Sequence, residues 1–323
     1  MVTFSIGANE GAQRLDKFLK KYLRGAPLSF VYKAIRKDVK VNGRRQKQDY
    51  VLKEGDEVTL YLSEEDLARY HPARKTVRAR KQFTVAYEDS QILIVDKPPG
   101  LLTHGDGREK GNHLANQVLA WLIGEGKYDP REKSFVPAPV NRLDRNTAGL
   151  VIFPKTYDAL KVMNRLLRDH ASIRKFYLTI VAGELREPLH LLGAMTRDES
   201  RNKTLVSEEG KSMETLVEPL RSVESYTLCQ VEIRTGRTHQ IRTQLADAGY
   251  PLVGDTKYGD PSINRIMRDR FGLTAQLLVA WELAFSDMPA GYEHLNGKRV
   301  QAKKPKKFRE IEEALGLSGK GNL

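Results

Sequence analysis

The chain has 323 residues and a single cysteine, Cys229, so it cannot form an intrachain disulfide, which fits a reducing compartment. It contains no apolar run near the roughly 20 residues that a membrane-spanning helix needs. Its first residues lack the charged start and apolar core of a secretory signal. We therefore expect a cytoplasmic protein that does not enter a membrane. Cys229 lies in the alternating run YTLCQVEI, which favours a packing role.

Several catalytic motifs are missing too. GEGKYD lacks the upstream glycine and the final Ser/Thr of a Walker loop, and HGDGREKG does not open a helix after a strand, as a dinucleotide fingerprint does. There is no H-E-x-x-H, no cysteine pair and no G-x-S-x-G, and the seven histidines are scattered. A metal-dependent nuclease would need clustered acids for two-metal chemistry. We expect no metal and no nucleotide cofactor.

What the chain does have is positive charge. It carries 54 Lys and Arg against 41 Asp and Glu, a net charge of +13. Such an excess points to a polyanionic partner, with nucleic acid first because binding phosphates releases counterions. An anionic membrane is less favoured, since no long amphipathic basic helix is present. The length allows about two domains.

Residues 1–62 are predicted to form a small unit of two helices and a hairpin. Apolar residues recur at helical spacing in RLDKFLKKYL, and LSFVYKAIRK predicts a second helix with Ser29 as its N-cap. Two strand-like runs follow, with turn signals at Asn42-Gly43 and at 54–56. Basic residues concentrate in the second helix and the hairpin, which indicates a phosphate-binding surface over a merely solvated face. The candidate RNA contacts in this unit are Arg14, Lys33, Arg36, Lys37, Lys40, Arg44 and Arg45.

Residues 63–82 are polar and basic without sustained periodicity, and they predict a linker that either follows phosphate or is only a solvated tether. Strand-like runs outnumber helices from residue 83 to 300, and several are separated by hairpin-length connections. This pattern predicts an α+β domain on a mostly antiparallel mixed sheet. Residues 301–323 are expected to be a basic C-terminal tail.

The stretch PVNRLDRNTAGLVIFPKT places Asp144 between Arg142 and Arg145, before a turn-prone cluster and a buried strand. One interpretation is a surface loop with an ion pair worth under ~1 kcal/mol. The other is a functional acid held among cations.

Two further segments carry candidate residues. In THQIRTQLADAG, Arg242 lies beside the apolar stripe of a predicted helix, where a guanidinium needs a carboxylate partner. A local acid, Asp247 or Asp255, is one alternative for that partner. Tyr177 in RKFYLTI is either a core residue or a stacking platform for a base.

These pieces together closely resemble the RluA-type family of RNA pseudouridine synthases. The resemblance covers about Phe83 to Phe285 and is carried by VDKPPGLLTH, NRLDRNTAGLVIF, the Lys175-x-Tyr177 element and TGRTHQIRTQLADAGYPLVGDTKYG. Residues from about Gln13 to Leu62 resemble the S4 RNA-binding domain, through RLDKFL, YKAIRK and VKVNGR followed by EGDEV.

The resemblance implies a role for each candidate residue. Asp144 is the catalytic carboxylate, Arg242 pairs with it and orients it, and Tyr177 stacks on the target uracil. Arg142 enters the RNA in place of the flipped base, and Arg145 beside it is a further RNA contact. The reaction is an isomerisation, which needs no cofactor.

The implied partner is structured RNA, most often 23S ribosomal RNA or a ribosome-assembly intermediate, with tRNA as the alternative. A competing hypothesis is a non-catalytic S4-type RNA-binding factor with a retired synthase domain. Two positions depart from the family pattern. Asn141 and Val279 each occupy a position where the family commonly has histidine.

Overall fold

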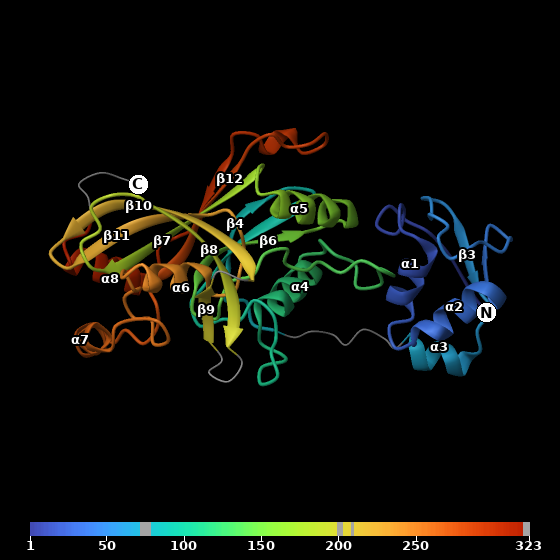
Figure 1. Cartoon of the computed structure of the whole chain (residues 1–323). Helices are drawn as coiled ribbons and strands as arrows, with labels where there is room; N and C mark the ends of the chain where they lie inside the picture. The colour runs from blue at the N-terminus through green and yellow to red at the C-terminus, as the bar shows by residue number, and fades with distance from the viewer. Residues whose placement is uncertain (72–78, 199–202, 208–209, 319–323) are drawn as a thin grey trace.

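The computed structural model describes residues 1–71, 79–198, 203–207 and 210–318. They form a small N-terminal unit and a larger domain built on one long sheet (Figure 1). The predicted α+β class with a mostly antiparallel mixed sheet is confirmed.

The N-terminal unit packs two helices against a three-stranded antiparallel sheet of order β1-β3-β2. The first strand was not predicted from the sequence. The second helix begins at Leu28, with Pro27 at its N-cap position and no side-chain capping bond, so Ser29 lies inside the helix and is not its cap. The elements are β1(Val2–Ser5), α1(Leu15–Tyr22), α2(Leu28–Lys37), β2(Val39–Val41) and β3(Glu57–Leu60).

The segment predicted as a linker begins with a helix, α3(Glu64–Tyr70). Ser63 caps it by accepting a hydrogen bond from the Asp66 backbone N–H at 3.0 Å. Three acidic residues occupy its first turn, where they favour the positive end of the helix dipole. These local signals are sufficient for a helix of two turns, which is too short for apolar periodicity to reveal. Residues 72–78 of the predicted linker lie outside the described residues.

The large sheet has ten strands, in the order β4-β5-β6-β12-β7-β11-β10-β8-β9, with β13 paired to β12. Among the strands that the structure describes, only β6 and β12 pair in parallel, with Val279 opposite Ala148. The strands are β4(Thr84–Glu88), β5(Ile92–Lys97), β6(Ala148–Pro154), β7(Ile173–Ala182), β8(Leu189–Asp198), β9(Lys203–Ser207), β10(Lys211–Val223), β11(Tyr226–Ile233), β12(Leu278–Phe285) and β13(Arg299–Gln301).

Alternating side chains divide the core of this domain between the two faces of the sheet. In β6, Leu150 and Ile152 belong to one buried cluster and Val151 and Phe153 to the other. α5(Tyr157–Asp169) and α7(Pro261–Phe271) cover the first face, and α4(Leu114–Gly124) and α6(Gln240–Asp247) cover the second. Because α6 carries Arg242, its packing sets the position of that side chain.

The segment expected to be a basic tail packs as part of the large domain. It forms α8(Lys306–Ala314), whose Phe308 and Ile311 are fully buried in the first cluster together with Leu317. The helix is amphipathic, so Lys306, Arg309 and Glu310 are exposed while its apolar side is buried. The tail was predicted from the charge of this segment, without regard to its apolar spacing.

The two units make direct contacts. The Gln13 side-chain amide donates to Ser134 Oγ at 2.9 Å in a buried position. Asn9 accepts from the Tyr157 backbone N–H at 3.1 Å and donates to Glu132 at 3.1 Å. The segment before α1 therefore lies against the start of α5, and Figure 1 shows the N-terminal unit at the end of the molecule nearest α4 and α5.

Cys229 is fully buried in β11, and burial raises the pKa of its thiol to about 12, as suits a packing residue. Among the residues that the structure describes, no helix is long and apolar enough to cross a membrane.

The parallel junction of β6 and β12 depends on Gly149. Its φ is +112°, and a Cβ built there would lie 2.2 Å from the Ala280 carbonyl oxygen. Backbone of a neighbouring strand cannot yield as a flexible side chain can. We expect Gly149→Ala to lower the free energy of unfolding by about 3 kcal/mol in chemical denaturation. Gly291→Ala is the control, since Gly291 has φ +84° but nothing within 4 Å, and it should cost about 1 kcal/mol. Equal losses would contradict the close approach.

Candidate active site

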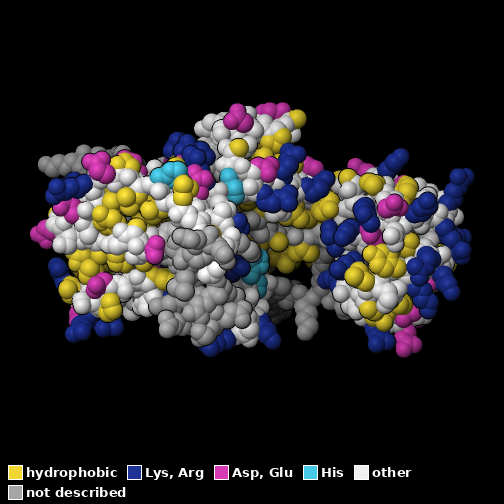
Figure 2. Space-filling view, viewed as in Figure 1, with side chains coloured by type: hydrophobic (Ala, Val, Ile, Leu, Met, Phe, Trp, Pro, Cys, Tyr) yellow, Lys and Arg dark blue, Asp and Glu magenta, His cyan; other side chains and the backbone are white. Residues whose placement is uncertain are grey.

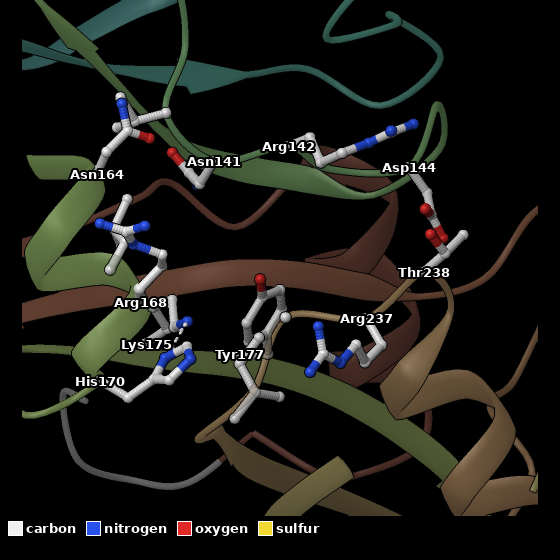
Figure 3. A pocket seen from close by; sticks show the side chains of 14 residues that line it. Asn141, Arg142, Asp144, Asn164, Arg168, His170, Lys175, Tyr177, Arg237 and Thr238 are labelled. Carbon is white, nitrogen blue, oxygen red and sulfur yellow. Dashed lines mark hydrogen bonds between the residues drawn. The ribbon is translucent and has the colours of Figure 1, made fainter. Parts of the chain in front are cut away.

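A cavity of about 540 Å³ opens where the loop before β6 meets β7 and the segment before α6. Asp144, Tyr177 and Arg142 all line it (Figure 3). Asp144 comes from the turn that leads into β6, and Tyr177 from the middle of β7. The structure therefore brings together side chains that are 33 residues apart in the sequence and that were predicted to share one site.

Arg242 joins two carboxylates. Its Nη1 donates to Asp144 Oδ2 at 3.0 Å, while its Nε and Nη2 donate to the two oxygens of Asp255 at 2.6 and 2.9 Å. Asp144 and a local acid were alternative partners on the sequence, and the structure contains both pairs. The bidentate bond to Asp255 fixes the plane of the guanidinium, so its remaining edge is presented to Asp144.

Asp255 is itself completely buried and held by backbone. One of its oxygens accepts from the N–H groups of Lys257 and Tyr258 at 2.9 and 3.1 Å. Burial opposes ionisation of Asp255, but the bonds from Arg242 and these amides outweigh it and lower the carboxyl pKa. Burial also opposes the charge of Arg242, and the bonds to Asp255 and Asp144 outweigh it and raise the guanidinium pKa. Both groups therefore remain charged in the buried pair.

The Tyr177 ring lies in the centre of the cavity wall, with its hydroxyl pointing into the cavity (Figure 3). The residue is 8% exposed. Burial, with the nearby Asp144 charge, raises the pKa of the hydroxyl, so it stays neutral at physiological pH. A fixed aromatic side chain beside a carboxylate provides a surface on which a planar ring can stack.

Lys97, whose role the sequence analysis did not recognise, holds the Asp144 loop. It is completely buried, and its ammonium donates to the carbonyls of Pro98, Leu101 and Arg145 at 3.1, 2.7 and 3.0 Å. Burial lowers its pKa to about 7, although Asp144 and Asp96 favour its charged form. No sequence pattern showed that the strand ending in Lys97 lies beside the Asp144 loop.

His239 is a second neighbour of Asp144 that sequence reasoning missed. Its Nε2 lies 3.6 Å from Asp144 Oδ2, and its Nδ1 is hydrogen-bonded to the Tyr258 hydroxyl at 2.9 Å. It occupies the N-cap position of α6 in a left-handed conformation, with φ +60°. Burial lowers the imidazole pKa despite the Asp144 charge, so the ring is neutral at pH 7.

The two departures from the family pattern both have structural roles. The Asn141 amide donates to the Leu150 carbonyl at 3.1 Å and its oxygen accepts from the Ile152 N–H at 2.8 Å, so it anchors the loop to β6. Val279 is buried between Ala148 and Leu178 in the centre of the sheet.

The predicted RNA contacts differ in whether a carboxylate of the protein already pairs with them. Arg142 is exposed at the cavity rim. Arg145 pairs with Asp106 at 3.2 Å, and Arg14 pairs with Asp16 at 2.8 Å, so a carboxylate already engages each of these two.

The remaining candidate contacts lie on the N-terminal unit, whose surface carries many Lys and Arg side chains (Figure 2). We call this set the basic corner. Its members are Lys33, Arg36, Lys37, Lys40, Arg44 and Arg45. Lys40, the one that is only partly exposed, lies over the Tyr61 ring at 5.3 Å.

Within the described ranges, no group of three or more His, Cys, Asp and Glu side chains is placed to hold a metal ion.

Removal of the Asp255 charge should destabilise the protein. Asp255→Asn leaves buried Arg242 with one partner, and we expect a loss of about 3 kcal/mol in the free energy of unfolding at pH 7. Because the folded pKa is depressed, this contribution is present above the unfolded value of about 4 and is lost as the pH falls through the folded value. Denaturation at pH 7 and pH 3 should thus show a smaller difference from wild type at low pH. Asp247→Asn, at the exposed acid nearby, should change neither curve.

Known proteins with a similar sequence or fold are RNA pseudouridine synthases. The family description RNA pseudouridylate synthase matches residues 91–247, which include Asp144, Tyr177 and Arg242. The fold is shared with human RNA Pseudouridylate Synthase Domain Containing 4, with a TM-score of 0.55 and 20% identity over 72% of this chain and 93% of that one.

Two bacterial relatives match nearly the whole chain. Ribosomal large subunit pseudouridine synthase C of Salmonella typhi is 31% identical over 96% of this chain and 95% of its own length. Ribosomal large subunit pseudouridine synthase C of Escherichia coli K12 is 32% identical over 89% of each chain. With this similarity over the full domain and the fold in agreement, the chain belongs to the RluA-type family of RNA pseudouridine synthases, which are isomerases.

Proposed function

We propose that the protein isomerises one or a few uridines of 23S ribosomal RNA to pseudouridine, with Asp144 as the catalytic carboxylate. The observation that carries this is the fixed geometry at the cavity. Arg242, itself held by Asp255, presents Asp144 at 3.0 Å beside the Tyr177 ring. A buried arginine held on both sides leaves the carboxylate little freedom to rotate.

The reaction requires a bond to break and another to form at the same sugar carbon. The C1′–N1 bond breaks, the uracil turns while it is still bound, and C1′ joins C5. C5 then loses its proton and N1 gains one, so there is no net oxidation or reduction. A carboxylate beside the ribose can act as a nucleophile at C1′ or as a base. Asp144 lies at the cavity wall with its side chain 27% exposed, so it is accessible to a bound nucleotide.

Tyr177 and Arg142 hold the target uridine outside the RNA stack before and during this step. A uridine in folded RNA must leave its stack to reach the carboxylate, at a cost of a few kcal/mol. The Tyr177 ring receives the extruded uracil by stacking, and its buried position keeps the ring in one orientation. Arg142, exposed at the rim, fills the space that the base leaves in the RNA.

The choice of ribosomal RNA rests on the relatives and on the basic corner. The bacterial relatives are named as ribosomal large subunit synthases and match this chain through its N-terminal unit. We assign that unit as an S4-type RNA-binding domain that docks on structured RNA, in a ribosome-assembly intermediate in the cytoplasm. tRNA is the alternative substrate.

Asp144→Asn should abolish pseudouridine formation and leave RNA affinity within about tenfold, or ~1.4 kcal/mol. The amide keeps the size and one hydrogen bond to Arg242 but has no negative charge to attack or accept a proton. Turnover is measured by tritium release from C5-labelled RNA, and binding by filter retention. Asp247→Asn serves as the control. Turnover of Asp144→Asn near the wild-type rate would show that another group is the nucleophile or base.

The basic corner should supply affinity and not chemistry. In Lys37→Gln/Arg44→Gln/Arg45→Gln, three exposed cations are removed, so the slope of log K against log[salt] should become shallower by about two to three. The single-turnover rate at saturating RNA should stay near wild type. Arg186→Gln is the control, because Arg186 is exposed on the large domain and paired with Glu184. If the salt slope of the triple variant were unchanged, the basic corner would not contact the RNA.

Deletion of the gene should remove one or a few pseudouridines from 23S ribosomal RNA. Carbodiimide-based mapping of ribosomal and transfer RNA, with and without the gene, measures this directly. Wild-type protein should restore the modification and Asp144→Asn should not. Changes confined to tRNA would correct the substrate and keep the enzyme class. If no position changed, the hypothesis of a non-catalytic RNA-binding factor would replace this one.

A further inference from the structure

The cavity is larger than the space around Asp144 and Tyr177. Figure 3 shows Tyr177 near its middle, with Asp144 and Thr238 on one side and a second group of polar side chains on the other. We call this second group the α5 half of the cavity. It consists of Asn164 and Arg168 from α5, His170 just after that helix, and Lys175 at the start of β7.

Lys175 is the buried cation of the α5 half. It is 8% exposed, and its Nζ makes a 3.2 Å hydrogen bond to His170 Nδ1. Among the described residues, it forms no ion pair with a carboxylate. Burial lowers its pKa to about 8, with no acid near enough to oppose the shift, so most of it is still charged at pH 7. An ammonium has three hydrogens to donate and a high cost of burial without partners.

His170 holds Lys175 in this position. The histidine ends α5 in a left-handed conformation, φ 55°, which few residues other than glycine adopt. Burial lowers the imidazole pKa, and the charges of Lys175 and Arg237 lower it further. A neutral ring accepts at Nδ1 from the Lys175 ammonium, whose other hydrogens remain available.

The charges around the cavity select an anion. Arg168 and Arg237 line it from exposed positions, and Arg142 lies at its rim. Asp144 is the one carboxylate among the lining residues, and Figure 3 shows it across the cavity from Lys175. We propose that the α5 half binds a phosphate of the RNA backbone next to the target uridine, with Lys175 as its buried ligand and Arg168 as its outer one.

The spacing along β7 suits this assignment. Lys175 and Tyr177 are two residues apart on one strand, so their side chains point to the same face about 6.6 Å apart. A uracil stacked on Tyr177 with its ribose at Asp144 leaves the adjoining phosphate to reach the α5 half. A carbonyl of the uracil is a weaker match, because one neutral acceptor does not require several cations. This assignment rests on the proposed function for the position of the uridine.

The test uses Lys175→Met, which keeps the apolar stem and removes the charge. The substrate is an RNA fragment around the mapped uridine, made with ordinary phosphates or with one neutral methylphosphonate on either side of that uridine. Lys161→Met is the matched control, because Lys161 lies on the exposed side of α5 beside Asp158. Thermal melting of each variant shows whether it is folded.

For the wild type, one of the two methylphosphonates should raise KM about tenfold. Lys175→Met should show a similar rise on ordinary RNA, little further rise with that methylphosphonate, and kcat within about threefold of wild type. Binding by wild type should also weaken as the pH rises through 8, since the free lysine loses its charge there. Lys175→Arg should bind without that pH dependence. Lys161→Met should behave as wild type in every assay.

Three outcomes would overturn the assignment. Additive losses from Lys175→Met and both methylphosphonates would show that Lys175 does not contact phosphate. A fall in kcat with KM unchanged would place Lys175 on the reacting base. A lower melting temperature with unchanged methylphosphonate sensitivity would make it structural.

Failure of the proposed function gives a different result. In that case wild-type protein forms no pseudouridine in any RNA. The α5 half is then tested by binding to whole 23S ribosomal RNA, where Lys175→Met should reduce the salt slope by about one and Lys161→Met should not. An unchanged slope for Lys175→Met would overturn the assignment in this arm.

Discussion

The double pairing of Arg242 is the interaction on which the site depends. Its bond to Asp144 spans 98 residues of sequence and its bond to Asp255 spans 13. Asp255 is inaccessible to solvent and held by backbone amides, so the guanidinium is fixed from the protein side and oriented toward the cavity. A carboxylate bound by a free arginine would gain little, since such pairs are weak and mobile. Here burial makes the pair rigid, and that rigidity gives Asp144 a defined direction.

The surrounding backbone positions Asp144 next to this arginine. The Asp144 turn leads into β6, which meets β12 in the one parallel pairing among the described strands, with Gly149 in close contact with Ala280. Lys97 ties the same turn to the end of β5 through the Arg145 carbonyl. The Asp144 carboxylate is thus positioned by a strand junction and a buried ammonium, neither of which touches it directly.

The sequence predicted those features whose causes are local. Alternation, apolar runs and helical spacing located α1, α2, β6, β11 and α6, because these patterns arise from side chains close together in the sequence. The long hairpins of β8 to β10 and helices α3 and α8 were missed. The strands mix polar and apolar residues, and the helices are short or strongly charged, so their patterns are weak. Likewise, the partners of Arg242 stayed open in the sequence, since Asp144, Asp247 and Asp255 are equally acidic.

By itself, then, the sequence determined the class of protein and the α+β architecture, and it identified Asp144, Tyr177 and Arg242 as candidate site residues. Motifs and hydrophobic periodicity are properties of the order of residues along the chain, so they can be recognised without the structure. Only the tertiary structure decided which side chains share the cavity. It brought Lys97 beneath the Asp144 turn, His239 to 3.6 Å from Asp144, and Lys175 into the α5 half of the cavity. These contacts depend on the order of the strands in the sheet and on where α5 and α6 end against it. Neither can be predicted from the separation of the residues in the sequence.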